Sequence, residues 1–150
     1  MKRYIKSAVS EPDITDTTTL WTILADPNLR PFVLDDMYDK YPNMWAGIAQ
    51  HPNSSTELLL KIANNTPACS SWVCDEKTTI FDALAHNPNS SAQILDIVAH
   101  KCAGWSYMRL IKNPNTSYRT LSYISKDMDK ATTAARRLAR ERMKGNLGGD

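Results

Sequence analysis

The stretch Asn87-Pro88-Asn89-Ser90-Ser91 decides the fold of this 150-residue chain, because it recurs. His51-Pro52-Asn53-Ser54-Ser55 precedes it and Asn113-Pro114-Asn115-Thr116-Ser117 follows it, while Asp26-Pro27-Asn28 is a weaker first copy. The four prolines are spaced by 25, 36 and 26 residues. Self-similarity at such a period is typical of an architecture built from repeated supersecondary units.

Apolar residues recur at fixed distances on both sides of each proline. Three lie 7, 4 and 3 residues before it and three lie 6, 7 and 10 residues after it, and each spacing places its residues on one helical face. The proline ends the first helix because it lacks an N–H and disfavours helical geometry in the preceding residue. The predicted contact residues are Leu20, Ile23, Leu24, Val33, Leu34, Met37, Trp45, Ile48, Ala49, Leu58, Leu59, Ile62, Phe81, Leu84, Ala85, Ile94, Leu95, Val98, Tyr107, Leu110, Ile111, Thr120, Leu121 and Ile124.

The second helix of each unit is expected to begin just after the proline. Ser54, Ser90 and Thr116 stand two residues after it and are the predicted N-caps. The segments Ser54-Ser55-Thr56-Glu57 and Ser90-Ser91-Ala92-Gln93 also fit the capping box, in which the fourth side chain bonds back to the cap. Each unit is therefore predicted to be one α-helix paired with one short or 3₁₀ helix.

The run Asn-Pro-Asn-Ser/Thr followed by Leu-x-x-Ile/Val-Ala/Ser resembles the variant leucine-rich repeat family over residues 19–140. The resemblance implies an all-α fold: a right-handed, HEAT-like α-solenoid of about four to five helix pairs. The chain departs from the family's pattern where Ser55, Ser91 and Ser117 replace the proline often found as the first helical residue. One architecture of the family holds an iron–sulfur cluster in a Cys-rich N-terminal segment. This chain has no such group of cysteines, so we expect no cofactor.

The predicted boundaries follow from the units. Residues 1–18 are expected to be an irregular N-terminal segment, residues 19–144 the helical-repeat domain and residues 145–150 a flexible tail. The long step between the second and third prolines predicts an insertion over about residues 65–75.

The last predicted helix lacks its proline. It runs from Asp129-Lys130-Ala131 to Arg142-Met143 and is rich in Ala and Arg, both strong helix formers. Aligning Leu138-Ala139 with Leu110-Ile111 makes it a final first helix, ended by Lys144-Gly145-Asn146.

The composition, 42% hydrophobic and 23% charged, is that of a soluble globular protein. No apolar run reaches the length of a membrane span, and no apolar stretch of a signal peptide follows the basic residues 1–6. An odd number of cysteines, Cys69, Cys74 and Cys102, favours reduced thiols and a cytoplasmic location. Cys69 and Cys74 with a histidine would be only a fragment of a zinc site, so we predict no metal.

Charge is divided unevenly along the chain, although its net value is +2. Residues 11–100 carry −8 and residues 101–144 carry +8. Such asymmetry is a hint about binding partners.

A basic patch is predicted at the C-terminal end. Arg109 and Lys112 stand five and two residues before the last proline, and Arg137 and Arg140 take the same places in the terminal helix. Stacked units would set these four side chains side by side. Such a patch suits phosphate groups, but a solvated face on a terminal helix is the favoured interpretation. Further candidates at its edge are Arg119, Lys130 and Arg136.

No order of Ser, His and Asp indicates catalysis, and Trp21, Trp45 and Tyr107 are expected to be core residues. Trp72, in the insertion, is a candidate anchor for a protein partner, but packing over the widened step is the favoured interpretation. Repeat arrays commonly act by binding.

The leading hypothesis is a non-enzymatic, cytoplasmic protein-interaction module or scaffold with no membrane contact, and self-association is a further option. The alternative is a nucleic-acid-binding protein that uses the basic patch. A helical-repeat DNA-repair glycosylase ranks last, because no catalytic acid stands beside an aromatic shelf.

Overall fold

The computed structural model of the protein describes residues 17–68, 75–102 and 106–149. This part of the chain is helical and contains no strand, which confirms the all-α prediction. The helices are α2 (Thr17–Leu24), α3 (Pro31–Lys40), the 3₁₀ helix η2 (Pro42–Met44), α4 (Trp45–Gln50), α5 (Thr56–Asn65), α6 (Asp75–His86), α7 (Ala92–Lys101), α8 (Ser106–Lys112), α9 (Tyr118–Lys126) and α10 (Thr133–Gly149).

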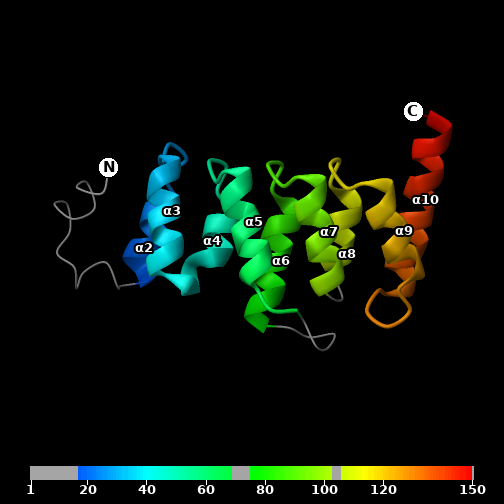
Figure 1. The fold of residues 1–150 in the computed structure, drawn as a ribbon, viewed down its shortest axis with the longest axis horizontal. Helices are drawn as coiled ribbons and strands as arrows, with labels where there is room; N and C mark the ends of the chain where they lie inside the picture. The colour runs from blue at the N-terminus through cyan, green and yellow to red at the C-terminus, as the bar shows by residue number, and fades with distance from the viewer. Residues whose placement is uncertain (1–16, 69–74, 103–105, 150) are drawn as a thin grey trace.

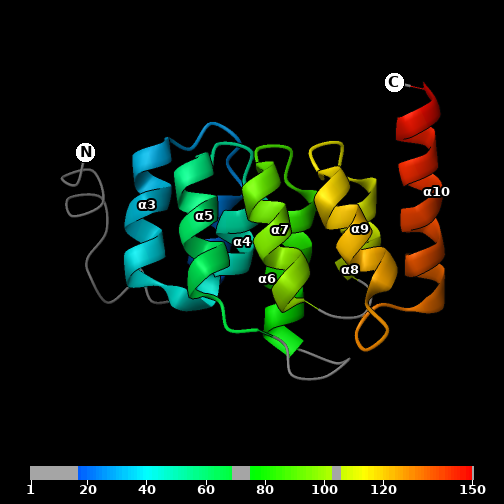
Figure 2. The same cartoon turned by 45° about the vertical axis from the view of Figure 1, so that its right-hand side comes forward.

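The helices follow one another along the long axis of the molecule in chain order (Figure 1). Helices α2, α4, α6 and α8 pack on one another in one layer, and α3, α5, α7 and α9 form the second layer (Figure 2). The loops that contain the prolines lie along one long edge, which we call the loop edge (residues 25–30, 51–55, 87–91 and 113–117). Helix α10 packs against α8 and α9 at the C-terminal end of the row.

The core lies between the two layers and contains the predicted contact residues. All of them are buried except Ile23 and Trp45, which are half-buried against the core. Trp21, also expected in the core, is 44% exposed. It stands one residue away from the predicted buried position at Leu20, so its ring reaches the surface of α4 at Gly47 instead of the space between the layers.

The structure shows which kind of helix the short first helix of a unit is. Helices α4 and α8 are α-helices of six and seven residues, and among the described residues the 3₁₀ conformation is a separate element, η2, that leads into α4. Residues 65–75 were predicted as an insertion, but Asn65 still belongs to α5 and Asp75 begins α6. Helix α6 has twelve residues, so part of the extra length extends a helix. Residues 69–74, with Trp72, lie outside the described residues.

The ends of the domain also differ from the prediction. Helix α2 begins at Thr17, before the predicted boundary at residue 19, and residues 1–16 lie outside the described part. Helix α10 begins at Thr133, where the Thr132 hydroxyl accepts a hydrogen bond from the Ala135 N–H at 3.0 Å. It continues through Gly149, because Gly145 keeps a helical backbone and does not take the left-handed conformation that would end the helix.

The N-caps lie one residue later than predicted. In the units of Pro52, Pro88 and Pro114 the serine three residues after the proline accepts a hydrogen bond from the N–H at the third helical position, whereas Arg30 in the first unit makes no side-chain cap. Because that position is Leu58 or Ile94, Glu57 and Gln93 complete no capping box, and that prediction is wrong. The three bonds are Leu58 N to Ser55 Oγ at 3.1 Å, Ile94 N to Ser91 Oγ at 3.3 Å and Thr120 N to Ser117 Oγ at 3.2 Å.

The predicted N-caps, Ser54, Ser90 and Thr116, have a different task. Each is buried, and its hydroxyl donates to a carbonyl oxygen six residues earlier in the first helix of the unit. These bonds tie the start of the second helix to the end of the first, where carbonyl groups lack helical partners. The acceptors are Ile48 O at 2.5 Å, Leu84 O at 2.6 Å and Leu110 O at 2.5 Å.

The residue before each proline shapes its own loop. Its side chain accepts a hydrogen bond from the N–H two residues on, which is the geometry of an Asx turn. The donors and acceptors are Asn28 N to Asp26 Oδ1 at 2.9 Å, Asn53 N to His51 Nδ1 at 3.0 Å, Asn89 N to Asn87 Oδ1 at 2.8 Å and Asn115 N to Asn113 Oδ1 at 2.8 Å. Since His51 accepts through Nδ1, its proton lies on Nε2, which donates to Asp26 O at 2.7 Å.

Side-chain amides then join each loop to the loop before it. We call these amides the asparagine ladder (Asn53, Asn87, Asn89, Asn113 and Asn115). Asn87 and Asn113 reach the end of the preceding first helix, at Ala49 O and Ala85 O, both at 2.7 Å. The other three each bridge two carbonyl oxygens of the preceding loop: Pro27 and Leu29 for Asn53, Pro52 and Ser54 for Asn89, and Pro88 and Ser90 for Asn115.

We expect Asn113→Asp to lower the free energy of unfolding by about 2–4 kcal/mol, because a buried carboxylate would face the Ala85 carbonyl oxygen in place of an N–H donor. Urea denaturation followed by circular dichroism measures this change. The matched control is Asp26→Asn in the first loop, which has an aspartate at the same position and is expected to change stability by less than about 0.5 kcal/mol. Equal changes in the free energy of unfolding for the two variants would contradict a stabilising role of the ladder.

Aspartate substitutions separate the true N-cap from the predicted one. Ser91→Asp is expected to stay within about 0.5 kcal/mol of wild type, because aspartate caps helices as well as serine does. Ser90→Asp is expected to cost about 3 kcal/mol or more, since it buries a carboxylate against Leu84 O. Thermal and urea unfolding of both variants measures the difference, and the reverse order would restore Ser90 as the cap.

Candidate binding surface

The predicted basic patch contains cations that hold the fold together. Arg136 donates to Ala131 O at 2.7 Å and to Asp127 O at 3.4 Å. Arg140 donates to Ser125 O at 3.4 Å, near the end of α9. Both side chains therefore supply donors to carbonyl groups at and just beyond the C-terminal end of α9.

Arg142 is a further structural cation that the sequence analysis missed. Its Nη1 donates to the carbonyl oxygens of Ile111 and Asn113, the latter at 2.8 Å. These carbonyl groups stand three residues and one residue before the last proline. Asn87 donates to the carbonyl groups at the same two places before Pro52, those of Ala49 and His51. Arg142 on α10 therefore makes the same contacts as a ladder asparagine. In the predicted alignment Arg142 falls at the place of Pro114, one residue after the place of a ladder asparagine, and this position was its signal in the sequence.

Other cations of the predicted patch are free. Arg109 and Lys112 on α8 and Arg119 on α9 are exposed, and among the described residues they have no hydrogen-bond or ion-pair partner. Arg137 is exposed and pairs with Glu141 on its own helix at 3.9 Å. The predicted four-residue patch is thus divided, because Arg140 binds α9 and Arg137 pairs within α10. An anion-binding role for the free cations stays a prediction.

Arg109 and Lys112 line a shallow hollow of about 300 Å³ at the loop edge, between α6 and α8. A second hollow, of about 280 Å³, lies between α2 and α4 at the same edge. The first is lined by Ala85, His86, Pro88, Arg109, Lys112, Asn113 and Pro114. The second is lined by Trp21, Leu24, Ala25, Pro27, Gly47, Gln50, His51 and Pro52.

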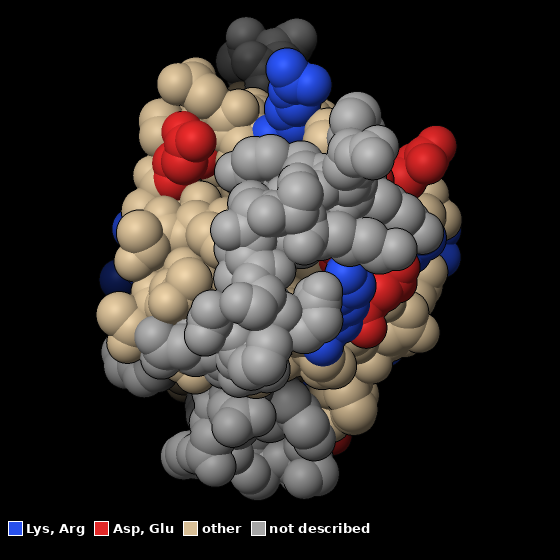
Figure 3. Space-filling view, turned by 90° about the vertical axis from the view of Figure 1, so that its left-hand side faces the viewer, with Lys and Arg blue, Asp and Glu red and all other residues tan. Residues whose placement is uncertain are grey.

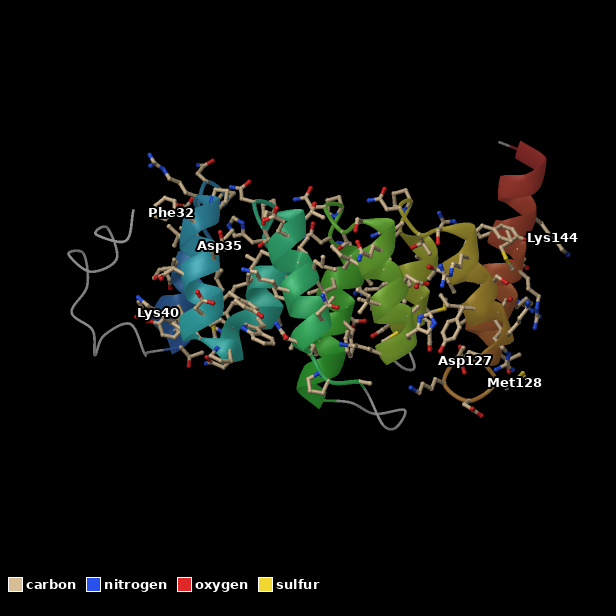
Figure 4. The ribbon with its side chains drawn as sticks, viewed as in Figure 1. Phe32, Asp35, Lys40, Asp127, Met128 and Lys144 are labelled. Carbon is tan, nitrogen blue, oxygen red and sulfur yellow. The ribbon has the colours of Figure 1, made fainter. Side chains whose placement is uncertain are left out.

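Large exposed apolar side chains are scattered. Trp21 lies at the loop edge, Tyr118 begins α9 and is 52% exposed, and Met128 is 72% exposed. Figure 4 shows Met128 beside Asp127 in the turn between α9 and α10, far from the loop edge. Isolated apolar side chains are ordinary on protein surfaces. These apolar side chains therefore define no binding surface, and the feature that distinguishes the C-terminal end of the row is its charge.

Buried ionisable groups keep their protonated forms. Burial raises the pKa of the Tyr107 phenol, whose hydroxyl donates to Asp127 Oδ2 at 2.8 Å. Burial and then the charge of Asp82 raise the pKa of the Cys102 thiol, and burial likewise raises the pKa of Tyr123. A thiol held in its neutral form is a poor nucleophile. Cys102 lies in the core and therefore acts as a packing residue.

Lys101 belongs to the same class of structural side chains. Its Nζ donates to the carbonyl oxygens of Ala63, Asn64 and Thr66, at 2.8, 3.0 and 3.0 Å. Burial lowers the pKa of this ammonium group. Lys101 thus caps the C-terminal end of α5 from the neighbouring helix α7.

Within residues 17–68, 75–102 and 106–149, no three His, Cys, Asp or Glu side chains gather as metal ligands would, and Cys69 and Cys74 fall outside these ranges. No helix of the described part is long and apolar enough to cross a bilayer. Comparisons with protein-family models, curated proteins and solved structures give no match for this chain.

Arg142→Met keeps the length of the side chain and removes its donors, which leaves the carbonyl groups of Ile111 and Asn113 short of a partner. We expect it to lower the free energy of unfolding by about 2 kcal/mol. The matched control, Arg137→Met, removes an exposed cation with a weak ion pair and is expected to cost less than about 0.5 kcal/mol. Chemical denaturation of both variants checks this difference, and similar losses would show that Arg142 is an ordinary surface residue.

Proposed function

We propose that this chain is a non-enzymatic interaction module, built as a right-handed α-solenoid of variant leucine-rich repeats. Successive helix pairs in two layers support the architecture, as do the identical bonds of the asparagine ladder at successive steps. Pro31 adds support because it is the first helical residue of α3, the place where that family often has proline. The corrected N-caps make Thr56, Ala92 and Tyr118 its equivalents in the later units.

The observation that carries the binding proposal is the recurrence of a hollow at the loop edge. One hollow lies between Pro27 and Pro52 and the other between Pro88 and Pro114, so equivalent positions of neighbouring units form both. All four prolines are exposed. A surface that repeats one shape with a changing lining suits an extended protein partner that lies along several units.

A nucleic-acid partner is the alternative. The observation in its favour is that Arg109, Lys112 and Arg119 are exposed and unpaired in the described part of the chain. Against it, Arg136, Arg140 and Arg142 are already bonded to carbonyl oxygens, so the cations form no continuous track. We therefore place a protein partner first.

We also propose a cytoplasmic location. Cys102 is a free thiol buried in the core, which fits a compartment that keeps thiols reduced. The free thiol is the observation that supports this location.

The test is retention of a partner from native extract by the immobilised full chain, with and without nuclease. We expect a protein partner that survives nuclease treatment. It should be lost when both hollows are filled by Gln50→Tyr with His86→Tyr, since both side chains are exposed and line the hollows.

The control variant carries Asn64→Tyr and Ala134→Tyr, at exposed positions away from the loop edge, and should retain the partner. Recovery of nucleic acid alone would favour the alternative. A partner held equally by both variants would exclude the loop edge as the binding surface.

A further inference from the structure

The two hollows have equivalent positions but different chemistry. They differ at the residues five and two places before the later proline. Between α2 and α4 these are Gly47 and Gln50, and a Cβ at Gly47 would lie 2.6 Å from the Trp21 ring. This hollow is therefore partly filled by an aromatic ring, and no Lys, Arg, Asp or Glu lines it. Between α6 and α8 the same positions are Arg109 and Lys112.

The two cations share one face of α8 because they are three residues apart. Both are exposed, and neither makes an ion pair with a described acidic side chain. Asp82 on the neighbouring helix α6 is engaged elsewhere, since it accepts a hydrogen bond from Ser106 Oγ at 2.8 Å. Two positive charges thus stand at a hollow without a counter-charge.

We propose that this hollow, which we call the cationic hollow, binds an acidic segment of a protein partner. Carboxylate side chains of that segment pair with Arg109 and Lys112. The guanidinium group of Arg109 offers a fork of donors that matches a carboxylate, and the ammonium group of Lys112 adds a point charge. The exposed rings of Pro88 and Pro114 form an apolar rim for the backbone of the segment. The inference rests on the proposed function and adds the chemistry of the partner.

The distribution of the other cations favours a peptide over nucleic acid. A nucleic-acid backbone needs a groove of positive charge along its length, whereas one or two carboxylates need only a local pair of cations. Beyond the cationic hollow, Arg136, Arg140 and Arg142 are bonded to carbonyl oxygens and Arg137 to a carboxylate. Arg119 on α9 is also free but does not line the hollow, so Arg109 and Lys112 are the two free cations of the predicted patch that stand together there.

A second copy of this chain is a less suitable occupant. Head-to-tail association would bring the opposite end of the row, at α3, to the basic end. Where described residues are visible at that end, Figure 3 shows acidic and basic side chains interspersed, and Lys40 there pairs with Asp36 at 3.2 Å. Figure 4 likewise shows Lys40 on the same helix as Asp35. A mixed surface gives weak attraction to a cation pair, so we commit to an acidic segment of another protein.

The test uses the full chain and a fluorescein-labelled hexaglutamate peptide at low ionic strength, with binding followed by fluorescence anisotropy. Arg109→Gln with Lys112→Gln is expected to weaken binding at least about tenfold, or ~1.4 kcal/mol. The matched control, Lys61→Gln with Arg137→Gln, removes the same charge at exposed sites outside the hollow and should change affinity less than about twofold. On the ¹⁵N-labelled wild-type chain, the peptide should shift the amide signals of His86 and of residues 109–113, a result that needs no variant to fold.

Equal weakening in both variants, or amide shifts elsewhere, would overturn the proposal. An oligothymidylate of the same length that binds more tightly, through the same two cations, would replace it with nucleic-acid binding. A doubled mass in light scattering that Arg109→Gln with Lys112→Gln abolishes would replace it with self-association. If the partner captured from extract is lost by filling the hollows yet kept by Arg109→Gln with Lys112→Gln, the acidic segment is excluded and the interaction module stands.

Discussion

The hydrogen bond from an asparagine side-chain amide to the backbone of the preceding loop is the constraint on which this structure depends. A helix that ends at a proline turn leaves carbonyl groups without helical donors. Asn87 and Asn113 meet this need from the next unit, across 38 and 28 residues of chain. Because the same bonds recur, each unit is set on the one before it in the same way.

The sequence predicts the helix pairs well because burial of a helical face depends on local spacing. It predicts less about the loops, where two hydroxyl residues follow each Asn-Pro-Asn stretch. Which hydroxyl caps the helix depends on which one packing buries, and Ser90 is buried whereas Ser91 is free to cap α7. The hydrogen bonds that the ladder asparagines donate are harder still to predict, because their acceptors are backbone carbonyl oxygens of the preceding unit.

The candidate surface was likewise predictable in part. Arg109 and Lys112 follow from the alignment of the units, and the structure places both at one hollow. The fate of Arg140 and Arg142 did not follow, because a long cationic side chain turns to whichever carbonyl groups lie within reach. Helix α10 packs on α9 as well as on α8, and that packing decides which carbonyl groups these are. The pattern of charge in the sequence therefore overstates the charge that is free to bind.

The asparagine ladder joins each loop to the loop next to it. Because the stabilising contacts are between neighbouring units, the row is expected to unfold unit by unit from an end. The cationic hollow is formed by residues on both sides of one boundary between units, with His86 on α6 and Arg109 on α8. A ligand in this hollow contacts both helices, so its binding stabilises the contact between α6 and α8 against local unfolding.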